Sequence, residues 1–121
     1  MAPTPPKSPL PIDPVLPGIV EALRTCPNLV LRAPTGAGKT TRVPLELMRQ
    51  DWAQAGWVVL VEPRRLAARA ACTQMACQLG EKPGDTVGYQ VRLEKRISGG
   101  TRVVAMTPGI LLGRLGDDPG L

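Results

Sequence analysis

The stretch that most constrains this chain is APTGAGKT, residues 33–40, which follows a short apolar run directly. Gly36 and Gly38 allow the backbone to adopt positive φ and to turn its N–H groups inward around an anion. Lys39 can place a positive charge between the β- and γ-phosphates of a nucleotide, and Thr40 can offer its hydroxyl to the accompanying Mg²⁺. The order of residue types therefore predicts a phosphate-binding loop at the start of a helix.

One residue of this stretch departs from the strict pattern, which has glycine where the chain has Ala33. Glycine-rich turns between a strand and a helix are also common packing devices. The stretch alone leaves two interpretations open, a phosphate-binding loop or a plain strand-to-helix turn, and the rest of the chain must decide between them.

Length and composition set the limits of what the chain can hold. Its 121 residues suit one small domain, and the absence of phenylalanine predicts an aliphatic core. The net charge of +5 suits a polyanionic partner or simply a solvated surface. With no histidine and with Cys26, Cys72 and Cys77 as its cysteines, the chain offers no histidine-dependent triad and no typical zinc site. No run of 18 apolar residues is present, so a soluble cytoplasmic protein with reduced thiols and no membrane contact is expected.

Apolar strands alternate with helical patterns along the chain, and this predicts an α/β fold with a mostly parallel sheet and flanking helices. Residues 1–12 are rich in proline and are expected to be a disordered lead-in, followed by the domain at residues 13–121. The predicted helices are residues 13–25, 39–50, 63–79 and 110–115, and the predicted strands are residues 28–32, 57–61, 87–91 and 101–106.

A pair of arginines follows the second predicted strand. Pro63 is expected at a helix start, which places Arg64 and Arg65 in the first turn, where the helix dipole disfavours cations. An external anion such as a backbone phosphate would account for both arginines. The alternative is a surface pair that forms ion pairs with Glu62 or Glu81.

The last predicted helix begins at Thr107, a capping hydroxyl, followed by a proline and by Gly109, which would let a ligand approach closely. Capping alone also explains Thr107. In an open α/β sheet the three helix starts would all lie at the carboxyl ends of parallel strands, where ligands bind. The sequence thus predicts one nucleotide site and two backbone-phosphate sites on one edge.

In order and spacing, these stretches resemble the first half of a DEAH-box helicase motor of superfamily 2. APTGAGKT resembles motif I, EPRRLAA at residues 62–68 resembles motif Ia, and TPGIL at residues 107–111 resembles motif Ib. VGYQVR at residues 87–92 is similar to a stretch typical of that branch. The likeness is to the bacterial HrpB-type helicases and spans about residues 10–121.

This resemblance implies a partial RecA-like P-loop NTPase domain that ends before the Walker B strand. The implied ligands of ATP and Mg²⁺ are Thr35, Gly36, Ala37, Gly38, Lys39, Thr40 and Thr41, with Thr40 at the metal and Lys39 as the catalytic residue of an incomplete site. The implied contacts to single-stranded RNA or DNA are Pro63, Arg64, Arg65, Arg92, Thr107 and Gly109. Tyr89 is expected in the core rather than as a base-stacking platform.

Family members continue into an Asp-Glu-x-His motif and a second RecA-like domain, neither of which this chain contains. The isolated chain is therefore expected to hydrolyse ATP very slowly, to need the remaining helicase domains as partners, and to expose apolar strand edges. Two other interpretations remain open: a non-enzymatic nucleotide or nucleic-acid binding module, and a fragment of a P-loop kinase or transporter ATPase. Its oligomeric state is not predicted.

Overall fold

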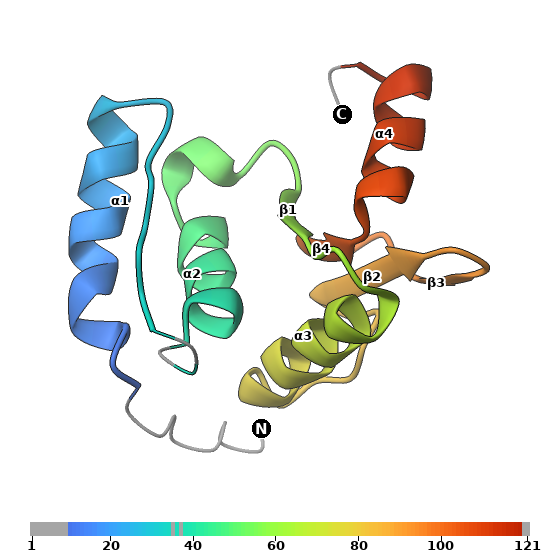
Figure 1. The fold of residues 1–121 in the computed structure, drawn as a ribbon, viewed down its shortest axis with the longest axis horizontal. Coiled ribbons are helices and arrows are strands. Elements are labelled where there is room, and N and C mark those ends of the chain that lie inside the picture. Colours follow the sequence, from blue (N-terminus) through green and yellow to red (C-terminus); the bar gives the residue numbers. More distant parts are fainter. Residues whose placement is uncertain (1–9, 35, 37, 120–121) are drawn as a thin grey trace.

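The computed structural model of the chain describes residues 10–34, 36 and 38–119. Within these residues it forms a four-stranded sheet with helices packed around it (Figure 1). In spatial order the strands are β1 (Val58–Val61), β4 (Val103–Met106), β2 (Val87–Val91) and β3 (Glu94–Arg96). β1, β4 and β2 are parallel, and β3 is antiparallel to β2. The predicted α/β fold with a mostly parallel sheet is confirmed.

The helices lie close to their predicted positions. They are a 3₁₀ turn η1 (Asp13–Val15), α1 (Leu16–Thr25), α2 (Lys39–Met48), a second 3₁₀ turn η2 (Asp51–Ala53), α3 (Arg65–Gln78) and α4 (Pro108–Asp117). α3 packs on β2 and β4, α2 packs on α3 and β1, and α1 lies beside α2 (Figure 1). Among the described residues no helix is both long and apolar enough to span a bilayer.

The core lies between the sheet, α2 and α3. It is almost wholly aliphatic, as the composition predicts, and Leu45, Met75 and Val103 are among its fully buried side chains. Tyr89 is 5% exposed and donates a hydrogen bond of 2.8 Å to Glu94 Oε1, which confirms the prediction that it belongs to the core. These contacts hold α3 and the β2–β3 hairpin against each other, and this packing positions the surface described below.

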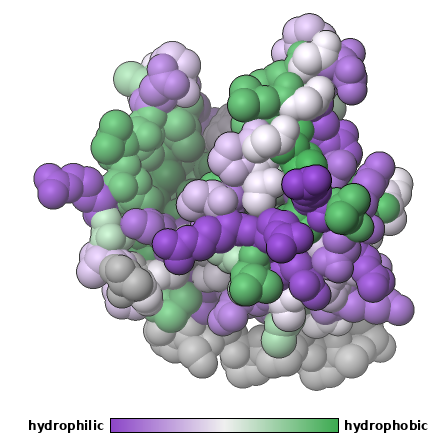
Figure 2. Space-filling view, turned by 45° about the vertical axis from the view of Figure 1, so that its right-hand side comes forward, coloured by the Kyte–Doolittle hydropathy of each residue, from purple (hydrophilic) through white to green (hydrophobic). Residues whose placement is uncertain are grey.

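The prediction of a strand at residues 28–32 is wrong. This segment is extended, yet among the described residues it forms no ladder with the sheet, in which β1 is the edge strand. The side chain of Val30 is 88% exposed and that of Leu29 is 41% exposed. An apolar run becomes a strand only where a neighbour pairs with it. Leu29 and Val30 thus expose apolar surface, as expected for the isolated chain. Hydrophobic residues also gather on one side of the face shown in Figure 2.

Another difference lies in the charged segment between the third and fourth predicted strands, where β3 forms a hairpin with β2. Its tight turn is Arg92–Leu93, and Leu93 has φ of +69°, a conformation that few non-glycine residues adopt. Alternating charges without apolar residues give no strand signal. β3 forms because the already buried β2 offers it a partner edge.

Gly88 on β2 is predicted to tolerate no side chain. A Cβ atom there would overlap the backbone carbonyl oxygen of Arg96 and lie 3.2 Å from Cγ2 of Thr101. We expect Gly88→Ala to lower the free energy of unfolding by about 1–3 kcal/mol, as overpacking does elsewhere. Gly18→Ala in α1 is the matched control, since its Cβ would meet nothing within 4 Å and the change raises helix propensity. Urea unfolding followed by circular dichroism measures both, and equal stability of the two variants would contradict the packing.

Cys72 is predicted to resist alkylation while Cys26 and Cys77 react. Cys72 is buried against β2, and burial raises the pKa of its thiol to about 11, an effect partly offset by the backbone of Gly84. Because the unfolded thiol ionises at lower pH, the stability from this group is complete below about pH 9 and is lost as pH rises through about 11. Iodoacetamide treatment followed by mass spectrometry should show modification at Cys26 and Cys77 only. Modification of Cys72 without denaturant would contradict its burial.

Candidate nucleotide and nucleic-acid site

The first candidate site is a hollow around the start of α2. It has a volume of about 340 Å³ and is lined by Leu10, Gly36, Gly38, Lys39, Thr40, Thr41 and Gln74. Gly36 has φ of +84° and Gly38 has φ of +102°, which is the left-handed backbone that the loop was predicted to need. Thr35 and Ala37, also predicted to belong to this site, lie outside the described residues. We call this the loop hollow.

Cationic and polar groups converge in the loop hollow. Lys39 is exposed, and its Nζ atom makes a long hydrogen bond of 3.5 Å to the carbonyl oxygen of Ala33. The first N–H groups of a helix have no intrahelical partner and carry the positive end of its dipole. Together with the hydroxyls of Thr40 and Thr41, these groups suit a phosphate chain.

The amino-terminal segment packs over the loop. A Cβ atom on Gly38 would lie 2.6 Å from Leu10 Cδ1 and 3.1 Å from Ile12 Cγ2, so a side chain there would force Leu10 to shift. The φ of Gly38 disfavours other residues in any case. Ile12 is 3% exposed and so packs with the domain, whereas residues 1–9 of the predicted disordered lead-in lie outside the described residues.

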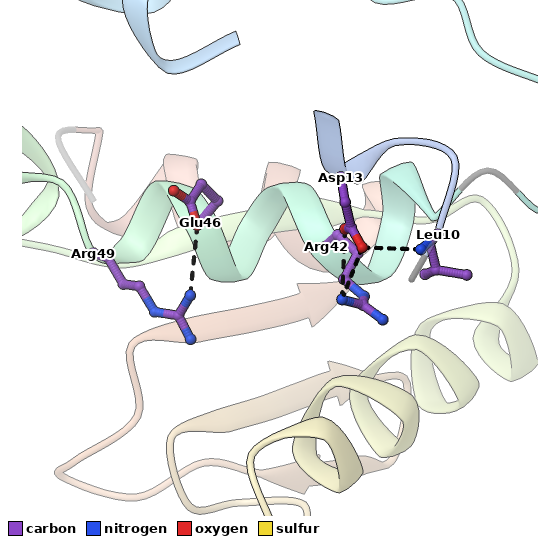
Figure 3. Close-up of polar contacts among 5 residues, drawn as sticks. All are labelled: Leu10, Asp13, Arg42, Glu46 and Arg49. Carbon is purple, nitrogen blue, oxygen red and sulfur yellow. Dashed lines mark hydrogen bonds and ion pairs between the residues drawn. The ribbon is translucent and has the colours of Figure 1, made fainter. Parts of the chain in front are cut away.

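Asp13 fixes this segment to α2. Its Oδ2 atom accepts a hydrogen bond of 2.9 Å from the backbone N–H of Leu10 (Figure 3). The same atom lies 3.4 Å from Nη1 of Arg42, and Arg42 is only 6% exposed. One turn later on α2, Glu46 pairs with Arg49 at 3.5 Å (Figure 3). The ion pair between the nearly buried Arg42 and the partly exposed Asp13 thus links the segment covering the loop to the helix that follows the loop.

The second candidate site is a basic hollow of about 260 Å³ between the start of α3 and the β2–β3 turn. It is lined by Arg65, Leu66, Arg69, Val91, Arg92, Leu93 and Glu94. The structure therefore brings together Arg65 and Arg92, two residues predicted from separate motifs. Glu94 Oε1 lies 3.1 Å from Nε of Arg69. We call this the arginine hollow.

The start of α3 differs from its prediction. The helix begins at Arg65, and Arg64 precedes it with φ of −120° and ψ of 141°. The backbone N–H of Glu62 still bonds to the carbonyl oxygen of Met106, at 2.9 Å, so the chain stays extended past β1. Pro63 therefore does not occupy the first turn. Among the described residues neither Arg64 nor Arg65 forms an ion pair, and the carboxylate of Glu81 binds Thr86 instead.

The start of α4 is exposed and lines neither hollow. Pro108 is its first residue, as predicted, but the hydroxyl of Thr107 makes no capping hydrogen bond. Gly109 is exposed, and a Cβ atom there would meet nothing within 4 Å. α3 and α4 nevertheless follow the carboxyl ends of two neighbouring parallel strands, β1 and β4, as predicted. The prediction is wrong for the third helix start, because among the described residues no strand of the sheet leads into α2.

No family model matches the chain. The ATP-dependent RNA helicase HrpB of Escherichia coli (strain K12) is 45% identical to it over 114 residues, which cover 94% of this chain and 14% of the relative. The crystal structure of Escherichia coli DEAH/RHA helicase HrpB matches its fold with a TM-score of 0.88 at 44% identity, over 93% of this chain and 14% of that one. By sequence and fold, the chain belongs to the DEAH-box helicase family.

A further relative in this family is the ATP-dependent RNA helicase DHX30 of Gallus gallus, which is 39% identical over 93% of the chain. The chain spans 10% of DHX30 and 14% of HrpB. It therefore corresponds to a small part of each DEAH-box relative.

Sequence reasoning did not assign several residues that line the two hollows of this DEAH-box chain, among them Leu10, Gln74 and Arg69. Leu10 and Gln74 border the loop hollow, and Arg69 borders the arginine hollow. Arg69 could have been found, since it lies four residues after Arg65 and so on the same face of the helix. Leu10 and Gln74 are placed there by tertiary packing and carry no sequence signal.

Neither hollow offers a ready-made metal centre. Among the described residues no group of three or more His, Cys, Asp or Glu could hold a metal ion. Thr40 supplies a hydroxyl, and the residues lining the loop hollow include no carboxylate. These residues fit a Mg²⁺ ion that arrives already bound to the phosphates of a nucleotide.

Proposed function

We propose that this chain is the ATP- and nucleic-acid-binding portion of an ATP-dependent RNA helicase. One observation carries the proposal: α3 borders two separate hollows, the loop hollow at Gln74 and the arginine hollow at Arg65 and Arg69, and they share no lining residue. Each suits a phosphate ligand of a different kind. The names of the relatives, HrpB and DHX30, support the same assignment.

In the loop hollow the chain would hold ATP·Mg²⁺. The backbone from Thr35 to Gly38 would surround the β- and γ-phosphates, Lys39 would leave the carbonyl of Ala33 to contact them, and Thr40 would ligate the Mg²⁺. Ala37 would take part through its backbone N–H, and Thr41 through its hydroxyl. Bound Mg²⁺ would neutralise phosphate charge.

Single-stranded RNA or DNA would lie against the arginine hollow. Arg65 and Arg92 converge there from two elements and can bind one phosphate between them. Arg64 and Pro63 lie just before α3, and Thr107 and Gly109 lie at the start of α4 beyond the neighbouring strand. These four would contact the strand farther along the same edge.

We further propose that the chain alone binds ATP but cleaves it very slowly. Phosphoryl transfer needs groups that orient the attacking water and stabilise the developing charge. The described residues that line the loop hollow supply one lysine and two threonines, without a carboxylate. The remaining helicase domains would then be partners that complete the reaction.

Direct binding measurements test this proposal. Fluorescence titrations with a labelled ATP analogue plus Mg²⁺, and with labelled single-stranded RNA, should both saturate. For RNA, log K should fall linearly with log salt by about 0.7 for each phosphate contacted. Saturable nucleotide binding without any RNA binding would favour instead a fragment of a P-loop kinase or transporter ATPase.

An experiment with the other helicase domains distinguishes a helicase portion from a non-enzymatic binding module. Addition of an HrpB relative from which the corresponding segment has been deleted should restore RNA-stimulated ATP hydrolysis if this chain is a helicase portion. Unchanged hydrolysis despite tight binding of both ligands would support the binding module.

A further inference from the structure

A second basic hollow adjoins the arginine hollow. It has a volume of about 300 Å³ and is lined by Arg69, Thr73, Lys82, Pro83, Tyr89 and Arg96. Among the described residues, Tyr89 is its one lining residue from the stretches singled out in the sequence, and it was expected in the core rather than at a binding site. We call it the distal hollow.

The two basic hollows lie end to end along α3. Arg65, Arg69 and Thr73 follow one another at four-residue spacing and therefore share one face of the helix. Arg65 borders the arginine hollow, Thr73 borders the distal hollow, and Arg69 borders both. From Arg65 to Thr73 the helix rises by about 12 Å. The arginine hollow and the distal hollow therefore form one groove along α3 from Arg65 to Thr73, which we call the track.

The β2–β3 hairpin forms the other wall of this track and advances in the same order. Its turn, Arg92 and Leu93, lines the arginine hollow, and Arg96 farther along β3 lines the distal hollow. Lys82, from the loop after α3, adds a further cation there. One extended ligand could therefore follow both walls.

The charge of the track is strongly positive. Its lining residues include five cations, Arg65, Arg69, Lys82, Arg92 and Arg96. Among the described residues, Glu94 is the one acid that lines either basic hollow. Glu94 is already paired with Arg69 and accepts a hydrogen bond from Tyr89.

Two acidic residues near the track, Glu81 and Asp85, form hydrogen bonds with other groups instead of pairing with its cations. The carboxylate of Glu81 accepts bonds from the N–H and hydroxyl of Thr86, and that of Asp85 accepts the backbone N–H of Lys82. Within the described residues no ion pair engages Lys82 or Arg96. Repeated cations along a groove suit a ligand with repeated anions.

We propose that single-stranded nucleic acid continues from the arginine hollow past Arg69 into the distal hollow, where Lys82 and Arg96 contact its phosphates. This inference rests on the proposed function and extends it to the length and path of the bound strand. Tyr89 stays in the core and orients Glu94, which holds Arg69 between the two hollows.

The test compares a short and a long oligonucleotide on the full 121-residue chain. Labelled oligouridines of about 4 and about 12 nucleotides span the range of single-strand site sizes. The variant is Lys82→Ala/Arg96→Ala, both exposed positions. Its control is Arg24→Ala/Arg49→Ala, which removes the same charge from exposed positions on and after other helices.

Lys82→Ala/Arg96→Ala should weaken binding of the long oligonucleotide by about tenfold or more, consistent with losing charge-assisted hydrogen bonds. Its salt slope should fall by about 0.7 for each lost contact. Binding of the short oligonucleotide should change by less than about twofold, because the arginine hollow can hold it alone. Thermal melts should match those of the unmodified chain.

Three outcomes would overturn the inference. The first is an equal effect of Lys82→Ala/Arg96→Ala and of Arg24→Ala/Arg49→Ala on binding of the long oligonucleotide, and the second is an equal loss of affinity for both lengths in Lys82→Ala/Arg96→Ala. The third is that Lys82→Ala/Arg96→Ala loses binding of inorganic phosphate or polyglutamate but still binds the long oligonucleotide. Failure of the proposed function gives a different result. In that case the unmodified chain binds neither oligonucleotide. If instead Arg64→Ala/Arg65→Ala loses oligonucleotide binding and Lys82→Ala/Arg96→Ala does not, the proposed function stands and only the role of the distal hollow is contradicted.

Discussion

Lys39→Ala is expected to raise the dissociation constant for a labelled ATP analogue by about ten- to hundredfold, the range for losing a hydrogen bond to a charged group. Among the described residues, Lys39 is the one cation that lines the loop hollow. Its present partner is a carbonyl oxygen at 3.5 Å, so it can turn toward a phosphate at little cost. Fluorescence titration in the presence of Mg²⁺ measures the change.

Lys95→Ala is the matched control for Lys39→Ala. Lys95 is an exposed lysine on β3 that lines neither the loop hollow nor the arginine hollow. Its removal changes the net charge by the same amount and should leave nucleotide affinity within about twofold. Stability should be unchanged in both variants, because both side chains are exposed. Equal affinity of Lys39→Ala and Lys95→Ala would remove the loop hollow as the nucleotide site.

The second large effect is expected from Arg64→Ala/Arg65→Ala. This variant should weaken binding of single-stranded RNA by about tenfold or more and lower the salt slope by about 0.7 for each lost phosphate contact. Arg65 lines the arginine hollow with Arg92, and Arg64 extends the cationic surface before α3. Anisotropy titrations at several salt concentrations measure both quantities.

A lysine version separates charge from geometry. Arg64→Lys/Arg65→Lys keeps the charge but loses the planar guanidinium fork that binds a phosphate through two hydrogen bonds. It should retain most of the salt slope while losing part of the affinity. The charge control is again Arg24→Ala/Arg49→Ala. An RNA affinity that responds equally to this control and to Arg64→Ala/Arg65→Ala would show that only net charge matters.

The parallel sheet and the helices were predictable because local patterns and burial agree. β2 and β4 are apolar and lie in the interior of the sheet, and α3 buries Ala68, Cys72 and Met75 at helical spacing. For such elements the hydrophobic pattern and the tertiary environment favour the same structure.

The errors occur where a neighbour decides the outcome. Residues 28–32 have the apolar composition of a strand but no partner among the described strands, whereas charged β3 pairs because β2 provides an edge. The first turn of α3 was misplaced at Pro63 because the hydrogen bond from Glu62 to Met106 extends the chain beyond β1. Propensity carries no information about such pairings.

The site was predictable to the extent that its chemistry is local. The glycine conformations and Lys39 follow from one motif, and Arg65 and Arg92 were both predicted as nucleic-acid contacts. That they share one hollow depends on how α3 packs against the hairpin, as do the positions of Leu10 and Gln74. Residues brought together from distant segments can be found only once the packing is known.

The central claim is that nucleotide and nucleic acid bind at two separate hollows bordered by α3. The most direct measurement is a set of four titrations, in which Lys39→Ala and Arg64→Ala/Arg65→Ala are each titrated with the labelled ATP analogue and with single-stranded RNA. The account predicts that each variant loses affinity for one ligand by about tenfold or more and keeps the other within about twofold. Loss of both ligands in both folded variants, or of neither, would contradict two separate sites.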